Sequence, residues 1–284
     1  MTARIIDAHQ HFWQYTAAEY EWIDEPMAVL RHDFLPTDIE REIAAAGVDA
    51  VVSVQARQTI EETQWLLRMS QQFPFIAGVV GWLPLASSSI EAELERLAGD
   101  RKLRGVRHVL QGEDDEYMLT AEFNRGLGLL DRFGLAYDLL ILGRQLPAAI
   151  RLVDAHPRQV FILDHAAKPL IRSRVFEPWR TLIGELAERP NVYCKISGMV
   201  TEDDWATSSI ASVAPYIDGV LEAFGPRRSM YGSDWPVCLL ASTYSRWMQT
   251  VREALGELSE DEQSWIFGRT AEEAYRLTSA KEDG

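Results

Sequence analysis

The stretch Ile5-Ile6-Asp7-Ala8-His9-Gln10-His11-Phe12-Trp13 begins as an apolar run and ends with two histidines one residue apart. On a β-strand, residues i and i+2 point to the same face, so His9 and His11 would project side by side. Two adjacent imidazoles can bind one divalent metal ion or line a polar pocket that acts on a carbonyl group. A doubly wound nucleotide-binding sheet would normally carry a glycine-rich phosphate loop after its first strand, and this chain has none there. The stretch therefore favours a barrel over an open doubly wound sheet.

The rest of the chain repeats a strand-then-helix pattern. The strands are predicted from short apolar runs that are continuous rather than alternating, as expected for parallel strands buried on both faces. The eight runs are Ile5–Ala8, Ala50–Gln55, Ile76–Trp82, Gly105–Leu110, Leu135–Ile141, Val160–Asp164, Val192–Ile196 and Met230–Gly232. Helical patterns with start and stop signals follow, such as Thr59 three residues before Glu62, and Gly47 after a predicted helix. This alternation predicts an α/β fold, a (β/α)8 TIM barrel, with residues 1–284 forming a single domain.

Length, charge and cysteine use narrow the class of protein. The chain has 284 residues, of which 47% are hydrophobic, so it can bury a large core. Its formal net charge of −15 argues against nucleic acid and anionic membranes as partners, because both select basic surfaces. The sequence shows no apolar run long enough to cross a bilayer and no secretory signal pattern. Cys194 and Cys238 are expected to be reduced, so a cytoplasmic location is expected.

Polar and ionisable side chains collect where the predicted strands end. In a barrel, this carboxyl end of the strands is the end at which chemistry occurs. The side chains found there are His9, His11, Gln55, Trp82, Arg107, His108, Tyr137, Asp138, Asp164, His165, Lys168, Lys195, Ser197, Ser233 and Asp234. Burying so many such groups is costly unless they are paired or line a solvated cleft. The clustering predicts a functional site at this end of the barrel.

Each of these side chains also has a structural interpretation. A His-x-His pair is common by chance, and Asp234 could cap a helix. His32 and His156 are expected to be structural, because they lie in loop and helix-end positions. Trp13 and Trp22 could belong to the core, but two tryptophans in the loop after the first strand favour a pocket wall or a lid.

Five motifs taken together resemble a known family. They are Asp7-Ala8-His9-Gln10-His11-Phe12-Trp13, Gly105-Val106-Arg107-His108, Leu163-Asp164-His165-Ala166-Ala167-Lys168-Pro169, Cys194-Lys195-Ile196-Ser197-Gly198-Met199 and Tyr231-Gly232-Ser233-Asp234-Trp235-Pro236. In this order along nearly the whole chain, they resemble the sugar-lactonase branch of the amidohydrolase superfamily, which includes L-fuconolactonase-like and L-rhamnonolactonase-like enzymes. The resemblance implies a metal-dependent-hydrolase-like barrel that hydrolyses a cyclic carboxylic ester.

The resemblance also implies roles for individual residues. The residues that match its catalytic and metal-site positions are His9, His11, His165 and Asp234, and those that match its lactone-holding positions are Arg107, His108 and Lys195. Many members of the superfamily bind two metals through a carboxylated lysine on strand four and a histidine on strand five. This chain offers Arg107 and His108 on strand four, and Tyr137 and Asp138 on strand five, so a two-metal site is not expected. The four catalytic positions leave room for at most one Zn²⁺, and a metal-independent site is the alternative.

Lactone hydrolysis requires a base for the attacking water, positive charge at the developing oxyanion and an acid for the leaving alkoxide. Asp234 is the predicted base, assisted by His165, and the groups predicted to polarise the carbonyl are Arg107, His108 and Lys195. The further substrate contacts predicted are Gln55, Tyr137, Lys168, Trp13, Trp22 and Trp82. Such partners suit neutral hydroxyl groups, whereas a dicarboxylate ring would call for several arginines. The expected substrate is a small neutral aldono-1,4- or 1,5-lactone, such as L-fuconolactone, opened to the aldonic acid.

Three alternatives stay open. A metal-dependent decarboxylase of the same superfamily would require a metal and release CO₂, and a second alternative is a hydrolase of a dicarboxylate lactone from aromatic degradation. The third is a barrel that binds a sugar acid without catalysis, although Asp234 beside the histidine pair argues against it. Apolar helix faces would also suit a homo-oligomer.

Overall fold

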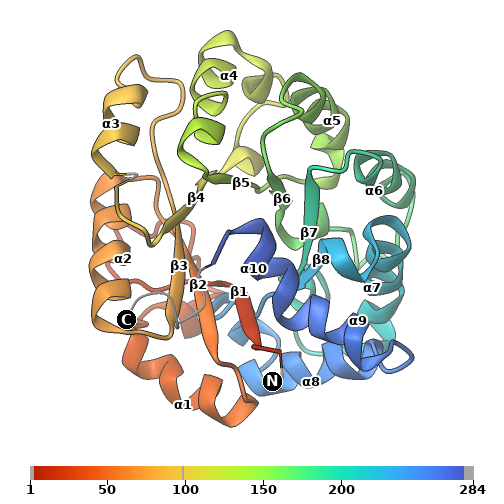
Figure 1. The fold of residues 1–284 in the computed structure, drawn as a ribbon. Coiled ribbons are helices and arrows are strands. Elements are labelled where there is room, and N and C mark those ends of the chain that lie inside the picture. Colours follow the sequence, from red (N-terminus) through yellow and green to blue (C-terminus); the bar gives the residue numbers. More distant parts are fainter. Residues whose placement is uncertain (1–2, 98, 278–284) are drawn as a thin grey trace.

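Eight parallel strands form a barrel with helices around it, within residues 3–97 and 99–277 that this computed structural model describes (Figure 1). The strands are β1 (Ile6–Gln10), β2 (Ala50–Val54), β3 (Ile76–Gly81), β4 (Leu103–His108), β5 (Ala136–Leu139), β6 (Phe161–Leu163), β7 (Val192–Ile196) and β8 (Ser229–Tyr231). Each strand pairs in parallel with the next one along the chain. The predicted (β/α)8 barrel is confirmed.

Helices cover the outside of this barrel. They are α1 (Pro36–Ala46), α2 (Ile60–Gln72), α3 (Ile90–Leu97), α4 (Ala121–Leu127), α5 (Leu146–Ala155), α6 (Trp179–Ala187), α7 (Ile210–Phe224) and α8 (Tyr244–Ala254). The chain then forms α9 (Glu260–Ser264), a π-helical turn (Trp265–Arg269) and α10 (Thr270–Ala274). Figure 1 shows α10 over the centre of the strand ring. Tyr275, directly after α10, is fully buried in the apolar cluster inside the barrel. The C-terminal segment therefore plugs one end of the barrel.

Two apolar clusters share the strand side chains. The larger cluster lies between the strands and the outer helices, and the smaller one fills the barrel interior beside α10. Side chains alternate between them along each strand. On β5, Ala136 belongs to the inner cluster, whereas Tyr137 and Leu139 belong to the outer one. This alternation decides which of two neighbouring polar residues can reach a site inside the barrel.

One helix is shorter than the sequence predicts. The apolar pattern suggests a helix at Phe123–Phe133, but α4 ends at Leu127 and a 3-10 turn follows at Leu130–Phe133. Gly126 lies against the backbone of Leu85, where an added Cβ would come within 2.0 Å of the carbonyl oxygen. The close contact requires glycine, and glycine weakens the helix at this point.

The barrel closes between β8 and β1, and the two strands meet beyond the end of β8. The Asp234 N–H donates to the His9 carbonyl at 2.8 Å, and the His11 N–H donates to the Trp235 carbonyl at 2.7 Å. On the other side of β1, the register advances three residues, from Asp7 to Gln10, while β2 advances two. Such a β-bulge re-aims the side chains that follow it. The seam thus brings Asp234 beside His9 and His11.

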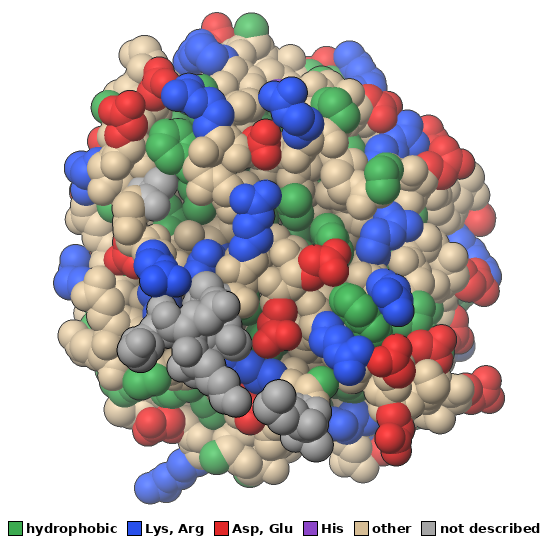
Figure 2. Space-filling model, viewed as in Figure 1, with side chains coloured by type: hydrophobic (Ala, Val, Ile, Leu, Met, Phe, Trp, Pro, Cys, Tyr) green, Lys and Arg blue, Asp and Glu red, His purple; other side chains and the backbone are tan. Residues whose placement is uncertain are grey.

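The surface carries both signs of charge despite the acidic net balance. Figure 2 shows Lys and Arg side chains interspersed with Asp and Glu side chains on the face covered by α10. Within the described chain, no helix combines the length and the apolar character that crossing a membrane requires.

Candidate active site

A pocket of about 400 Å³ lies where the strands end. Residues on or after seven of the eight strands line it, and only β3 contributes none among the described lining residues. The lining consists of His11, Trp13, Trp22, Met27, Ala56, Arg107, Val109, Gln111, Leu140, His165, Lys168, Thr201, Glu202, Trp205, Asp234, Val237 and Leu240. The pocket therefore occupies the end of the barrel at which TIM-barrel enzymes carry their active sites.

Asp234 lies among three histidines at the base of this pocket. Its Oδ1 is 3.4 Å from His11 Nε2, 3.7 Å from His9 Nε2 and 4.0 Å from His165 Nε2. Asp234 itself has a left-handed backbone, with φ of +56°. Non-glycine residues adopt this conformation at a cost, and such outliers cluster at functional sites. Asp234 thus combines a strained backbone with a carboxylate that points at the histidine cluster.

A second strained segment carries His165 and Lys168 into the pocket. The four consecutive residues from His165 to Lys168 all have φ between +48° and +59°, so the chain makes a left-handed turn directly after β6. A left-handed conformation costs about 1–2 kcal/mol per L-residue. The turn is tied down by the Lys168 N–H, which donates to the His165 carbonyl at 2.8 Å, and by Trp179 Nε1, which donates to the Ala166 carbonyl at 2.7 Å. The fold thus maintains a costly conformation that points the His165 ring and the Lys168 ammonium at one cavity.

Two glycines allow the strand ends to approach this closely. Gly198, with φ of +62°, lies so near His165 that an added Cβ would come within 2.6 Å of Nδ1. At Gly232, an added Cβ would come within 2.7 Å of the His9 Cβ. His165 Nδ1 is also held at 2.8 Å by the Ser197 hydroxyl. Side chains larger than glycine at these positions would push the histidines out of place.

Below the pocket lies a group of fully buried charged side chains, which we call the buried charge layer: Lys195, Asp138 and Asp164, with the Tyr275 hydroxyl. The Lys195 ammonium donates to Asp138 and to His9 Nδ1 at 3.0 Å, and it forms an ion pair with Asp164 Oδ1 at 2.9 Å. The Tyr275 hydroxyl donates to Asp138 at 2.6 Å. Arg107 reaches down to Asp164 Oδ2 at 3.0 Å. Two cations therefore balance two carboxylates.

Arg107 and His9 connect this layer to the groups that face the cavity. We call those groups the pocket layer: His11, His165, Asp234 and Arg107, all of which line the pocket. His9 is fully buried and contacts Lys195 through Nδ1, while its Nε2 faces the pocket layer. The site is thus built in two depths, with His9 between them.

The pKa values in the site follow from burial and neighbouring charge. Burial raises the pKa of Asp234, but His165, His11 and His9 outweigh it and hold that pKa well below its usual range. Burial lowers the pKa of His165 to about 4, with Asp234 opposing the shift. Burial and the Lys195 ammonium hold the pKa of His9 well below its ordinary value. At neutral pH the cluster is therefore one ionised carboxylate beside neutral His9 and His165 rings.

The structure brings together most of the residues expected at the site. Asp234, His165 and His11 lie in the pocket layer with Arg107, and His9 lies directly beneath them. Among the expected substrate contacts, Trp13, Trp22 and Lys168 also line the pocket.

Five expected substrate contacts lie outside the pocket lining. Tyr137 packs against Phe123 and Phe161 in the outer apolar cluster, because alternation along β5 turns Asp138, and not Tyr137, into the barrel. Lys195 is fully buried in the charge layer below the pocket, so it is not among the residues that line the cavity.

The other three support their neighbours. His108 pairs with Glu113 at 3.0 Å and accepts a hydrogen bond from Trp82 Nε1 at 3.3 Å. Gln55 is fully buried, and its side-chain amide donates to the backbone carbonyl of Arg107 at 3.3 Å. In return, the Arg107 guanidinium donates to the backbone carbonyl of Gln55. These contacts hold strand ends and Arg107 in place, so the three residues do not face the cavity.

Several residues that matter here were not assigned a role from the sequence. Asp138 and Asp164 complete the buried charge layer, and the signal was available, since a lysine and an arginine inside a barrel require carboxylate partners. Glu202 and Trp205 line the pocket from the loop after β7, and Glu202 pairs with Lys168 at 3.6 Å. No local pattern marks these two residues.

The donor atoms of His9, His11 and Asp234 are spaced suitably for one metal ion. The separations are 3.1 Å between the two Nε2 atoms and 3.4–3.7 Å from these to Asp234 Oδ1. Ligand atoms around a tetrahedral zinc lie about 3.3 Å apart, given metal–ligand distances of about 2.0–2.1 Å. Two imidazoles and one carboxylate, with His165 beside them, therefore fit a single divalent ion.

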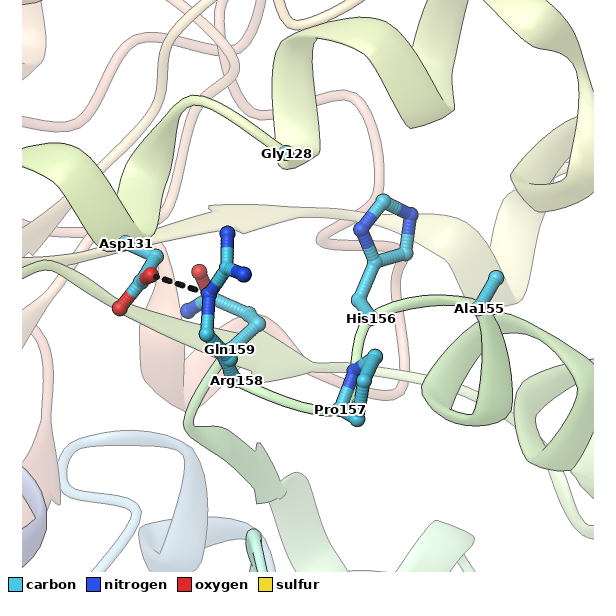
Figure 3. A pocket seen from close by; sticks show the side chains of 7 residues that line it. All are labelled: Gly128, Asp131, Ala155, His156, Pro157, Arg158 and Gln159. Atoms are coloured by element: carbon cyan, nitrogen blue, oxygen red, sulfur yellow. Dashed lines mark hydrogen bonds and ion pairs between the residues drawn. The ribbon is translucent and has the colours of Figure 1, made fainter.

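A second, smaller cavity of about 180 Å³ lies at the opposite end of the strands, between the end of α4 and the loop before β6 (Figure 3). It contains His156 and an ion pair between Arg158 and Asp131 at 3.4 Å. The Nε2 of His156 donates to the Asn124 side chain at 2.7 Å. The ring thus has a structural partner, as the sequence predicts.

A (β/α)8 barrel with a His/Asp cluster and an arginine at its strand ends defines a barrel enzyme of the hydrolytic type. The sequence profile of the family described as Amidohydrolase matches residues 6–277, and the chain belongs to this family.

Known relatives cover almost the whole chain. An L-fucono-1,5-lactonase from Burkholderia multivorans is 40% identical, with 98% of this chain and 97% of the relative covered. An L-fucono-1,5-lactonase from Burkholderia ambifaria is 37% identical over the same shares. The crystal structure of a Burkholderia multivorans amidohydrolase with bound zinc is 39% identical, covers 97% of this chain and 100% of that chain, and has a TM-score of 0.93.

Proposed function

We propose that the protein is a carboxylic ester hydrolase that opens a sugar lactone to the aldonic acid. The observation that carries the proposal is an ionised carboxylate, Asp234, that shares one cavity with His11, His165 and Arg107. The near full-length similarity to two L-fucono-1,5-lactonases supports an aldono-1,5-lactone such as L-fucono-1,5-lactone as the substrate.

Asp234 acts as the base for the attacking water. Its carboxylate accepts hydrogen bonds only, and its low pKa keeps it ionised, so it orients a water molecule toward the carbonyl carbon. A carboxylate of low pKa is a weak base, so the proton needs a further acceptor. His165, which burial keeps neutral, lies with Nε2 4.0 Å from Asp234 and takes up this proton. The pair then returns the proton to the leaving alkoxide as the ring opens.

Arg107 stabilises the oxyanion that forms on the carbonyl oxygen. Three side chains are expected to polarise the carbonyl, namely Arg107, His108 and Lys195. Of these, Arg107 is the one that lines the pocket. Its guanidinium is fixed from behind by Asp164 and by the Gln55 carbonyl. A donor fixed in this way stabilises charge in the transition state without having to reorganise.

The remaining lining suits a neutral ring. Arg107 and Lys168 are the two cationic side chains among the described lining residues. Each already forms an ion pair with a carboxylate of the protein, Arg107 with Asp164 and Lys168 with Glu202. A dicarboxylate would need uncompensated cations. Trp13, Trp22 and Trp205 supply indole surface against which the carbon face of a sugar can lie.

The residues that would hold one divalent ion are His9, His11 and Asp234, with His165 adjacent. When bound, such an ion supplies Lewis-acid polarisation of a carbonyl and lowers the pKa of a water molecule. The proposal includes at most one Zn²⁺ at this position, with metal-free turnover as the alternative.

A pH-indicator assay over a panel of 1,4- and 1,5-aldonolactones tests the proposal. It is run before and after chelator treatment, with metal content measured by elemental analysis. Rapid opening of neutral aldonolactones is expected. If no lactone opens faster than in buffer while a sugar acid binds, the chain is a binding protein, and metal-dependent release of CO₂ from an aromatic acid would make it a decarboxylase.

A further inference from the structure

Lys195 lies against one of the two ring nitrogens of His9. Its ammonium is 3.0 Å from His9 Nδ1, and its two other contacts are Asp138 and Asp164 Oδ1 at 2.9 Å. An ammonium has three N–H donors and no acceptor. The contact with His9 Nδ1 has hydrogen-bond geometry, and an ammonium can only donate, so His9 Nδ1 offers the lone pair. A neutral His9 ring then carries its proton on Nε2.

The contacts of His11 agree with this assignment. His11 Nδ1 is 2.8 Å from the Val54 carbonyl, and a carbonyl only accepts, so Nδ1 of His11 carries the proton. Nε2 of His11 therefore offers a lone pair, and it lies 3.1 Å from His9 Nε2. The two rings form a directional chain in which Lys195 donates to His9, His9 to His11, and His11 to Val54. All of these contacts are buried, so water does not compete with the chain.

We propose that Lys195 is a positioning residue that fixes His9 as its Nε2–H tautomer and thereby opposes metal binding through His9 Nε2. A metal ligand must present a lone pair, so binding through Nε2 requires the ring proton to move to Nδ1, by exchange with solvent. The Nδ1–H would then face the Lys195 ammonium, donor against donor. The nearby carboxylate oxygen Asp164 Oδ1 is 3.4 Å from His9 Nδ1, which is longer than the usual range of about 2.7–3.2 Å for an N–H···O hydrogen bond, so it compensates only weakly for that contact.

The surroundings of Lys195 keep it in this role. Asp138 and Asp164 are fully buried carboxylates that favour the ammonium form, and the Tyr275 hydroxyl fixes Asp138 from the barrel plug at 2.6 Å. The spacing of the ligand atoms therefore admits a metal, while the hydrogen bonds behind them disfavour it. The inference concerns the site of the proposed function, but it is tested without substrate, so a failure of lactonase activity leaves it intact.

The first test is ¹⁵N NMR of chelator-treated wild-type protein labelled at histidine, with His9 and His11 assigned from His9→Gln and His11→Gln. The expected result is a protonated Nε2 for His9 and a protonated Nδ1 for His11. A protonated Nδ1 on His9 would overturn the proposal. This measurement needs no change at Lys195.

The second test is zinc affinity, measured by competition with a chromophoric chelator. Lys195→Met combined with Asp138→Asn removes one buried cation and one buried anion, which preserves the charge balance of the layer. We expect zinc to bind about 10- to 100-fold more tightly, the scale on which ligand-orienting neighbours act.

The matched control is Lys168→Met, which removes an ammonium that lines the pocket but pairs with Glu202. We expect a much smaller change in zinc affinity there. Equal tightening in both variants would mean that general charge repulsion, and not the tautomer, sets the affinity. Unchanged affinity in the double variant would also contradict the proposal, and if that variant does not fold, the NMR result decides alone.

Discussion

The buried charge layer and the pocket layer contain the same kinds of charged side chain, but those of the first contact only other protein groups and those of the second face a cavity. In the buried charge layer, Lys195 and Asp138 are completely covered and each contacts other charged groups of the protein. In the pocket layer, Asp234 is only slightly more exposed, at 4%, but it lines a cavity. How deeply a charged side chain is buried below the cavity therefore decides whether it can contact a substrate. An ionisable residue at a barrel strand end can therefore be a structural support as readily as a reacting group.

The largest effect on stability is expected when a carboxylate is removed from the buried charge layer. Asp138→Ala leaves Lys195 with one fewer partner, and breaking a buried pair destabilises a fold by about 3–5 kcal/mol. Urea unfolding measures the free energy of unfolding. The control is Asp131→Ala, which removes the partner of the highly exposed Arg158 and should cost about 0–1 kcal/mol. Similar losses in both variants would show that the layer is not a special support.

Glu62 differs from the carboxylates of both layers, because it is buried and held mainly by backbone N–H groups. It accepts from Ala56 at 3.0 Å and Arg57 at 2.7 Å, yet burial raises its pKa to about 7 from 4.5. The folded state therefore keeps a proton that the unfolded state has lost, and the free energy of unfolding falls as pH rises from about 4.5 to 7. This contribution amounts to about 3 kcal/mol.

Comparison with Glu62→Gln isolates that effect, since the amide does not titrate. Urea unfolding at pH 4.5 and pH 8 should show the wild type losing about 3 kcal/mol relative to the variant. A stability difference that stays constant with pH would mean that Glu62 titrates normally.

Arg107 belongs to the pocket layer but is fixed by the layer below it. Arg107→Lys keeps the charge and loses the planar fork that contacts Asp164 and the Gln55 carbonyl together. Loss of one fixed oxyanion donor costs about 3 kcal/mol of barrier, or about a hundredfold in kcat. Steady-state kinetics should therefore show a fall in kcat that exceeds any change in KM. A change confined to KM would assign Arg107 to ground-state binding instead.

The smallest effect is expected at the rim of the pocket. Trp22 lines the pocket but is 43% exposed, so Trp22→Ala should raise KM about tenfold, a loss of about 1.4 kcal/mol, and leave kcat close to that of the wild type. Val29→Ala on the same loop serves as the control, since Val29 is exposed and is not among the described lining residues. A large fall in kcat for Trp22→Ala would place the reacting bond nearer the rim than we infer.

The barrel could be predicted from sequence because its strands are buried on both faces and therefore appear as continuous apolar runs. The same feature limited the prediction of the site, since a continuous run does not reveal which residues face inward. Tyr137 and Asp138 were placed together at a strand end, but alternation admits only one, and pairing with Arg107 across β4 and β5 selects Asp138.

Other features of the site depend on backbone geometry that no local pattern encodes. The bulge in β1 and the left-handed turn from His165 to Lys168 both change the directions of the side chains that they carry. The turn contains no glycine, which is the residue that would have indicated a left-handed backbone in the sequence. Lys195 was expected at the substrate, and its depth became visible only when Asp138, Asp164 and His9 were placed around it.

We infer that the pocket layer carries out the reaction and that the buried charge layer supports it. The most direct test is the initial rate of aldonolactone opening by Asp234→Asn, measured after chelator treatment together with its melting temperature. We predict a rate at least about a thousandfold below that of the wild type, equivalent to about 4 kcal/mol of barrier, with an unchanged melting temperature. A rate within tenfold of the wild type would show that the reaction does not depend on the Asp234 carboxylate.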